Sequence, residues 1–181
     1  RRRGAPLLRA ARAAPPQRPP GRGAGPYARA GYRRVAPGRG PAPRLKGAAA
    51  SEARAAFEAL LAGESPLVRL NLTGADLSGL DLSGKDLSEC WLESANLAGT
   101  NLAGANLEGA VLVRSDLTGT NLRDTNLRGA NLSLALCKDT VADGADLSEA
   151  ILVKTQFEDA SFRGSDLTGA LVMALDNPRV D

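Results

Sequence analysis

The chain has 181 residues, of which 43% are apolar and 24% charged, with a net charge of +3, no histidine, two cysteines and only six aromatic residues. The lack of histidine excludes Ser-His and Cys-His catalytic pairs and imidazole-bound metal sites. Two cysteines are too few for a disulfide framework or a four-thiolate zinc site. No stretch approaches 18 apolar residues, so we expect no transmembrane segment.

The charge is divided unevenly along the chain. Residues 1–46 contain twelve arginines, one lysine and no acidic residue, whereas the remaining 135 residues carry a net charge of −10. Nine of the eleven prolines also lie in that first part, which has no hydrophobic periodicity. Such a composition predicts a disordered basic tail over residues 1–50.

Three interpretations of the tail stay open. An arginine-rich, acid-free leader is typical of organelle transit peptides. Alternatively, the tail is an arm that contacts RNA or a larger assembly through its guanidinium groups, Tyr27 and Tyr32. The third interpretation is an unselected basic linker. The sequence does not decide whether residues 1–50 remain in the mature protein.

A short amphipathic helix is predicted over residues 51–64. Apolar residues recur there at helical spacing, at Ala53, Ala56, Phe57, Leu60 and Leu61. We expect Ser51 to be the N-cap and Gly63 to end the helix. The apolar face must be buried, and the adjacent repeats are the candidate for covering it.

From residue 65 to residue 174 the sequence repeats every five residues, twenty-two times, as in ADLSG at Ala75 and ANLAG at Ala95. The third position is leucine in seventeen repeats, the second is Asn or Asp in thirteen, and the fifth is glycine in eleven. A period of five fits neither a helix nor a long strand. Short extended segments joined by turns do fit it, with positions one and three inside, two and four outside, and five in the turn.

These repeats resemble the pentapeptide-repeat family, whose consensus A(D/N)LXX they match over 110 of 181 positions. The resemblance implies an all-β fold, a right-handed quadrilateral β-helix solenoid with four repeats per coil and about five and a half coils. Residues twenty apart should then stack, with the predicted helix capping the first coil. Cys90 and Cys137 should be buried, free thiols, and Cys137 with Ala142 should thin the core of the fourth coil.

The second face of this solenoid carries apolar residues where the repeat otherwise places polar ones. We predict a partner-binding stripe of several hundred Å² formed by these residues, namely Trp91, Val111, Val113, Leu134, Ile151, Val153, Leu171 and Met173. A protein partner or a second copy of the chain would dock on it, with Trp91 as the anchor. The alternative is that the chain covers the stripe itself, with the linker around residues 44–50 or with its C-terminal residues.

Residues 175–181 form a C-terminal tail that is too short for a capping helix. The last coil should therefore present an unpaired edge. We expect it to pair with a second copy, to bind another protein, or to be covered by chain beyond residue 181.

No catalytic constellation is found, so we expect a non-catalytic structural or protein-interaction module without cofactor or metal. The basic leader and compact rod resemble the chloroplast pentapeptide proteins, which implies a scaffold or assembly subunit of a thylakoid complex; stroma, thylakoid surface and lumen are not distinguished, and a cytoplasmic location is the alternative. A second hypothesis is a DNA-mimicking topoisomerase regulator, as in the quinolone-resistance members. A third is a scaffold whose basic arm contacts RNA or a larger assembly. The partner and the oligomeric state are left open.

Overall fold

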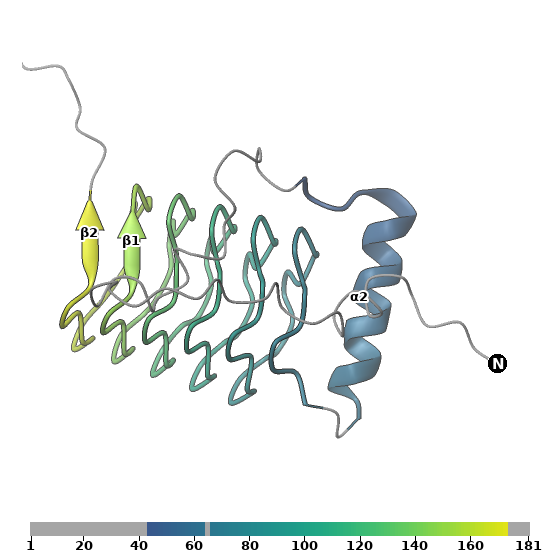
Figure 1. The fold of residues 1–181 in the computed structure, drawn as a ribbon, viewed down its shortest axis with the longest axis horizontal. Helices are drawn as coiled ribbons and strands as arrows, with labels where there is room; N and C mark the ends of the chain where they lie inside the picture. Colours follow the sequence, from purple (N-terminus) through teal and green to yellow (C-terminus); the bar gives the residue numbers. More distant parts are fainter. Residues whose placement is uncertain (1–42, 64–65, 174–181) are drawn as a thin grey trace, which may run out of the picture.

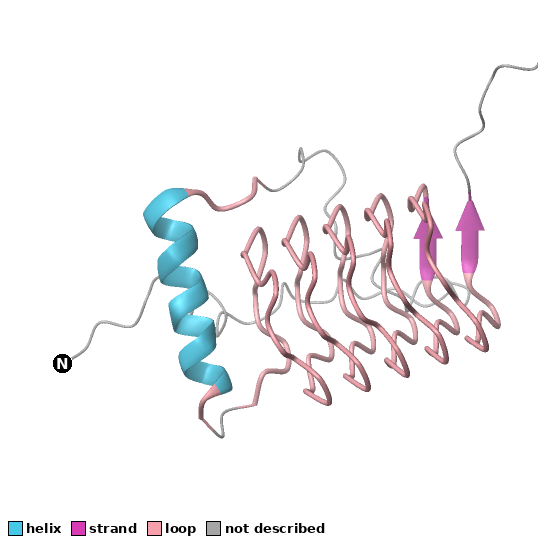
Figure 2. Cartoon of the chain, turned by 180° about the vertical axis from the view of Figure 1, so that it is seen from behind, coloured by secondary structure: helices cyan, strands magenta, loops and turns pink. Residues whose placement is uncertain are grey.

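The computed structural model describes residues 43–63 and 66–173. They form a rod of stacked coils with α2 (Gly47–Leu61) across one end and the short strands β1 (Ile151–Val153) and β2 (Leu171–Met173) at the other (Figure 1). Seen from behind, the coils between α2 and β1 consist of turns and short extended segments (Figure 2). The expectations for residues 1–42 and for the C-terminal tail lie outside the described residues.

The coils stack with a register of twenty residues. Parallel single-residue bridges join each coil to the next, from the pair Asn71 and Trp91 to the pair Asp146 and Asp166. Strands β1 and β2 keep the same register and also run parallel. Four five-residue units therefore make one turn, as the family resemblance implies.

The turns fall at the fifth position of each unit. Every fifth residue from Arg69 to Gly169 has a φ angle between +53° and +71°, in the left-handed region that favours glycine. The side chain at position two supports the turn. In one example, Asp81 Oδ1 accepts hydrogen bonds from the backbone N–H and the hydroxyl of Ser83, at 3.1 and 2.7 Å. Asn and Asp recur at position two because both offer this oxygen.

Leucines at position three fill the rod, and the small residues at position one pack beside them. Leu77, Leu97 and Leu117, which stack at twenty-residue spacing, are fully buried. Cys90 and Cys137 are buried and free, as predicted. Burial raises the pKa of each thiol to about 12, because the thiolate would lose its hydration.

Bulky aromatic residues follow the two small residues of the fourth coil. Cys137 and Ala142 are buried at position three, and the residues twenty positions later are Phe157 and Phe162. The two phenyl rings pack edge to face, with centroids 5.1 Å apart, and both contact the core. The larger rings thus adjoin the places where the preceding coil has less side-chain volume.

Helix α2 starts four residues earlier than the sequence predicts. Its N-cap position is Lys46, which makes no side-chain capping bond. Ser51 lies inside the helix, where its hydroxyl donates to the Gly47 carbonyl at 3.5 Å, so its predicted role as N-cap is wrong. The physical reason is the alanine run at residues 48–50, because alanine has the highest helix propensity and extends the helix backwards.

The apolar face of α2 packs on the rod. Phe57 is buried in the same core cluster as the leucines of the coils, and Leu60 and Leu61 pack against that cluster. Arg54 donates to the Ser78 carbonyl at 3.0 Å and so ties the helix to the coils. Within the described ranges, no helix combines the length and the apolar character needed to cross a bilayer.

Candidate protein-interaction surface

The predicted apolar stripe lies in two stacked columns on the second face of the coils. Their register follows from the bridges and from the pairing of β1 with β2. The first column consists of the position-two residues Asn71, Trp91, Val111, Asn131, Ile151 and Leu171. The second consists of the position-four residues Thr73, Glu93, Val113, Ser133, Val153 and Met173.

The middle of this stripe is not open to solvent. Val111, Val113 and Ile151 are only 2%, 4% and 3% exposed, so the expectation of a continuous exposed stripe is wrong at these three residues. Trp91, Val153 and Leu171 are half-buried. Leu134 and Met173 are exposed.

The burial is specific to this face. Asn131, in the same column, is also almost fully buried, whereas Asn121 and Asn126 hold the same repeat position on other faces and are half-buried. Leu136 and Val141, which are outward-facing apolar residues elsewhere on the rod, are half-buried as well. Position two therefore does not by itself bury a side chain.

The linker before α2 approaches one edge of the stripe. The Leu45 N–H donates to the Gly74 carbonyl at 2.9 Å. A β-carbon on Gly74 would lie 2.5 Å from the Pro43 carbonyl oxygen, so a side chain there would collide with the linker backbone. Arg44 reaches further and forms an ion pair with Asp116 at 3.2 Å.

The contact between the linker and the rod affects the pKa of Asp116. Partial burial favours the neutral carboxyl, but hydrogen bonds from Thr118 and the Arg44 guanidinium outweigh it and lower the pKa of Asp116. A carboxylate on the outside of the rod is thus matched to an arginine of the basic segment.

Large hydrophobic side chains are exposed toward the C-terminal end of the rod, three of them in its last two repeats. Among the described residues these are Leu134, Leu167, Val172 and Met173, which are between 38% and 59% exposed. Leu167 and Val172 occupy position three, which faces inward elsewhere in the rod. They are exposed because no further described coil stacks on them. These two residues are not among the predicted binding residues, although their place in the last repeats was a signal for their exposure.

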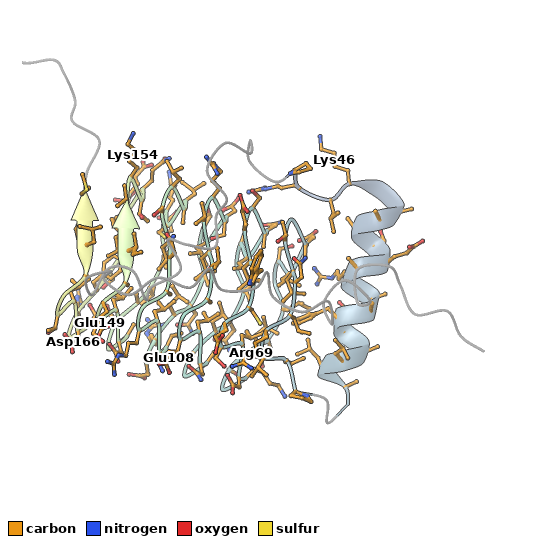
Figure 3. The ribbon with its side chains drawn as sticks, viewed as in Figure 1. Lys46, Arg69, Glu108, Glu149, Lys154 and Asp166 are labelled. Atoms are coloured by element: carbon orange, nitrogen blue, oxygen red, sulfur yellow. The ribbon has the colours of Figure 1, made fainter. Side chains whose placement is uncertain are left out.

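The acidic side chains of the rod are interrupted by basic ones. Residues 65–174 hold fifteen acidic and eight basic residues. Ion pairs join neighbouring coils, as between Arg69 and Glu89 at 2.9 Å and between Arg128 and Glu149 at 2.8 Å. Arg69, Glu108, Glu149 and Asp166 lie along one edge of the rod, so one basic and three acidic residues are found there (Figure 3). Basic side chains and ion pairs thus interrupt the negative charge of the rod.

No group of three or more metal-ligating side chains is found within residues 43–63 and 66–173. The carboxylates at position two instead serve the turns. Asp76 and Asp81, for example, have lowered pKa values mainly because the hydroxyls of Ser78 and Ser83 donate hydrogen bonds to them. Their chemistry in this setting is structural.

Solved structures of similar proteins cover parts of the chain. A pentapeptide repeat protein from the Arabidopsis thaliana thylakoid lumen is 39% identical over 52% of this chain and 63% of its own, with a TM-score of 0.42. A pentapeptide repeat protein from Nostoc PCC 7120 is 25% identical over 75% of this chain and 100% of its own, with a TM-score of 0.47. The plasmid-mediated fluoroquinolone resistance protein QnrB1 is 21% identical over 66% of this chain and 62% of its own, with a TM-score of 0.37.

The chain thus spans less than two thirds of the thylakoid-lumen protein's length. No curated protein shows a significant match. The family model for pentapeptide repeats matches eight copies, in segments at residues 71–108, 95–133 and 130–169. These segments cover more than half of the sequence and coincide with the coils of the rod. The chain belongs to the pentapeptide repeat family.

Proposed function

We propose that the chain is a non-catalytic protein-interaction module that docks on a protein partner through the C-terminal end of its rod. The observation that carries this proposal is the cluster of exposed hydrophobic side chains at that end. The docking surface combines Leu167 and Val172 with the adjoining part of the apolar stripe, namely Leu134, Val153, Leu171 and Met173. Exposed apolar surface of this kind marks interaction sites in soluble proteins.

The backbone at this end supports the same proposal. Strand β2 pairs with β1 along one edge, and within the described residues its other edge has no strand beside it. An unpaired edge can accept a strand from another chain. Main-chain pairing would then give affinity, and the side chains of Leu171 and Met173 would contribute specificity.

A pair of uncharged substitutions tests the surface. Leu134→Gln with Met173→Gln removes two exposed apolar side chains and should leave the rod folded. The matched control is Leu136→Gln with Val141→Gln, which alters two outward apolar residues on other faces. After affinity purification from the native source, the first variant should lose the partner that the wild type and the control retain. Equal recovery of the same partner with both variants would refute the proposed surface.

We further propose that the partner belongs to a thylakoid complex of a chloroplast and that the repeats at 65–174 form a right-handed quadrilateral β-helix of about five and a half coils. The support for the compartment is the arginine-rich, acid-free composition of residues 1–50. Sequencing the N-terminus of the native protein tests it. A mature chain that has lost the arginine-rich leader is expected, and a chain that retains residues 1–46 would argue for the basic arm instead.

A further inference from the structure

The turn residues at one corner of the rod depart from the repeat. Each coil has four corners, and residues twenty apart stack at each corner in successive coils. The corner beside the position-four column of the stripe contains three large side chains, Arg114, Leu134 and Lys154. We call these three residues the basic ridge. They lie in successive coils, whose backbones are about 4.8 Å apart.

The backbone of the basic ridge is one that favours glycine. The φ angles of Arg114, Leu134 and Lys154 are +58°, +62° and +58°, in the left-handed region where a β-carbon is sterically disfavoured. Glycine is the commonest residue at this repeat position. Three large side chains in succession are thus present at a corner where the turn itself would be better served by glycine.

The other three corners follow the repeat more closely. Two of them contain only glycine and aspartate at their described turns, and aspartate tolerates the left-handed region better than most residues. The third has three other residues that form ion pairs between coils, namely Arg69, Glu89 and Glu149. Leu134 cannot form an ion pair, and within the described residues none is found for Lys154. Side chains that are present against the local backbone preference often serve function.

The ridge is also the positively charged corner of an acidic rod. Its described turn residues include two cations and no acidic residue, whereas each other corner contains Asp or Glu. Residues 65–174 as a whole carry a net charge of −7. Arg114 lies 3.7 Å from Glu93 and its side chain remains 37% exposed. Lys154 is exposed and lies at the edge of the rod opposite to Glu108 and Asp166 (Figure 3).

We propose that the basic ridge binds an amphipathic α-helix of a protein partner, in which an apolar residue has an acidic residue one helical turn away on either side. The apolar residue packs on the exposed Leu134, and the two carboxylates pair with Arg114 and Lys154. Met173 is exposed and Val153 half-buried beside the ridge, where they extend the apolar contact. The inference rests on the proposed function in one respect, because Leu134, Val153 and Met173 also belong to the proposed docking surface.

The spacing of the ridge favours a helix over an extended segment. Residues three or four apart on a helix are separated by about 4.5–6 Å along its axis, close to the coil spacing of about 4.8 Å. Residues on the same face of an extended segment are about 6.6–6.8 Å apart and would lose register over three coils. Acidic residues seven positions apart on a helix, about 10.5 Å, match the two coil spacings between Arg114 and Lys154, about 9.6 Å.

Glycine substitutions separate binding from stability. The ridge variant combines Arg114→Gly, Leu134→Gly and Lys154→Gly. The matched control changes the same repeat position at other corners, through Asp124→Gly, Asp139→Gly and Asp159→Gly. Because glycine suits this backbone, we expect both variants to keep a Tm within about 4 °C of the wild type. If the ridge variant does not fold, the charge-reversed variant described below takes its place.

A display library of single helices, randomised on one face, provides the probe. Helices are selected for binding to the full wild-type chain and against binding to the ridge variant. The selected helices should carry Asp or Glu three or four residues before and after an apolar residue, and they should also bind the control variant. Selected helices without this acidic pattern would overturn the inference. So would a library in which no helix distinguishes the wild type from the ridge variant.

Charge reversal tests the ion pairs directly. Arg114→Glu with Lys154→Glu should weaken the binding of a selected helix about tenfold or more. The same helix with its two acidic residues replaced by lysine should bind this variant more tightly than it binds the wild type. The control reverses two arginines on another face, Arg123→Glu with Arg163→Glu, and should change the affinity less than about twofold. An affinity that reversal at the ridge leaves unchanged would refute the pairing.

Two further outcomes separate this inference from its alternatives. Binding of phosphatidylglycerol vesicles through the ridge, with no helix selected, would assign the ridge to a membrane surface and overturn the proposed helix. The proposed function is tested on its own by Leu134→Gln with Met173→Gln and the native partner. Loss of that partner in this pair but not on charge reversal would leave the docking surface in place and remove the ridge from it.

Discussion

The pairing of small and aromatic residues in the last coils predicts a strong energetic coupling. Ala142 is fully buried, and Phe162 stands twenty residues later at the same repeat position. Ala142→Leu restores the consensus residue but places three extra carbon atoms beside the ring, which should cost about 1–3 kcal/mol through overpacking. Phe162→Leu should cost about 1–2 kcal/mol, because it leaves a void beside Ala142 and removes the edge-to-face contact with Phe157.

The double variant should be more stable than the sum of these losses predicts, because a leucine on each coil reproduces the packing found elsewhere in the rod. We expect a coupling free energy of about 1–3 kcal/mol in favour of the double variant. A control cycle combines Ala142→Leu with Phe57→Leu. Phe57 lies on α2 at the opposite end of the rod, so the control should be additive within about 0.5 kcal/mol.

Urea unfolding of the four chains in each cycle provides the measurement. Circular dichroism follows the whole rod and the fluorescence of Trp91, the only tryptophan, follows one coil. Coincident transitions are needed, because repeat proteins can unfold in parts. Additive losses at Ala142 and Phe162 would refute the idea that the aromatic ring compensates for the missing leucine.

Three further predictions concern single groups. Thr120→Val should destabilise the rod by about 1–3 kcal/mol in urea unfolding, since the buried hydroxyl donates to the Leu97 carbonyl at 2.7 Å; Thr120→Ser should retain most of that stability, and equal losses would argue against the hydrogen bond. Asn101→Asp replaces the amide that donates to Asp81 at 3.0 Å with a second carboxylate. In the wild type, the hydrogen bond from the Ser83 hydroxyl is the main reason that the pKa of Asp81 is lowered. The ionised Asp81 carboxylate therefore stabilises the folded chain at pH values above the pKa of an aspartate in the unfolded chain, and this stabilisation is lost as the pH falls. The variant places like charges together, so its deficit should be largest at neutral pH and shrink in acid; a deficit that is constant with pH would count against this. Both native thiols should react with a disulfide reagent at pH 8 only after unfolding, and rapid labelling of the folded chain would contradict their burial.

The coils could be predicted from the sequence because the same repeat position has the same burial and backbone conformation in almost every repeat. The leucine at position three, the small residue at position one and the turn at position five each recur with a fixed role, so Leu97 and Gly99 behave like their equivalents in other coils. The burial of Cys90 and Cys137 follows from their positions alone. The ladder in which Asn101 donates to Asp81 was not predicted, because it depends on contacts between coils and not on the repeat unit.

The candidate site was harder to predict because it depends on non-repeating parts of the chain. The register of the bridges confirms that the apolar residues of the stripe stack, but the repeat pattern does not predict that Val111 and Ile151 are almost fully buried. The start of α2 was misplaced for a related reason. Ser51 is a good N-cap residue, yet the alanine run before it extends the helix to Gly47, so propensity outweighed the capping signal.

The two ends of the rod differ in how their apolar interior is covered. A stacked solenoid buries its interior by contacts between neighbouring coils, so each end coil needs a separate cover. At one end α2 supplies that cover through Phe57. Among the described residues at the other end, Leu167 and Val172 stay exposed. The C-terminal end is therefore the part of the described rod where a partner would bury the most exposed apolar surface, which is why the proposed docking site lies there.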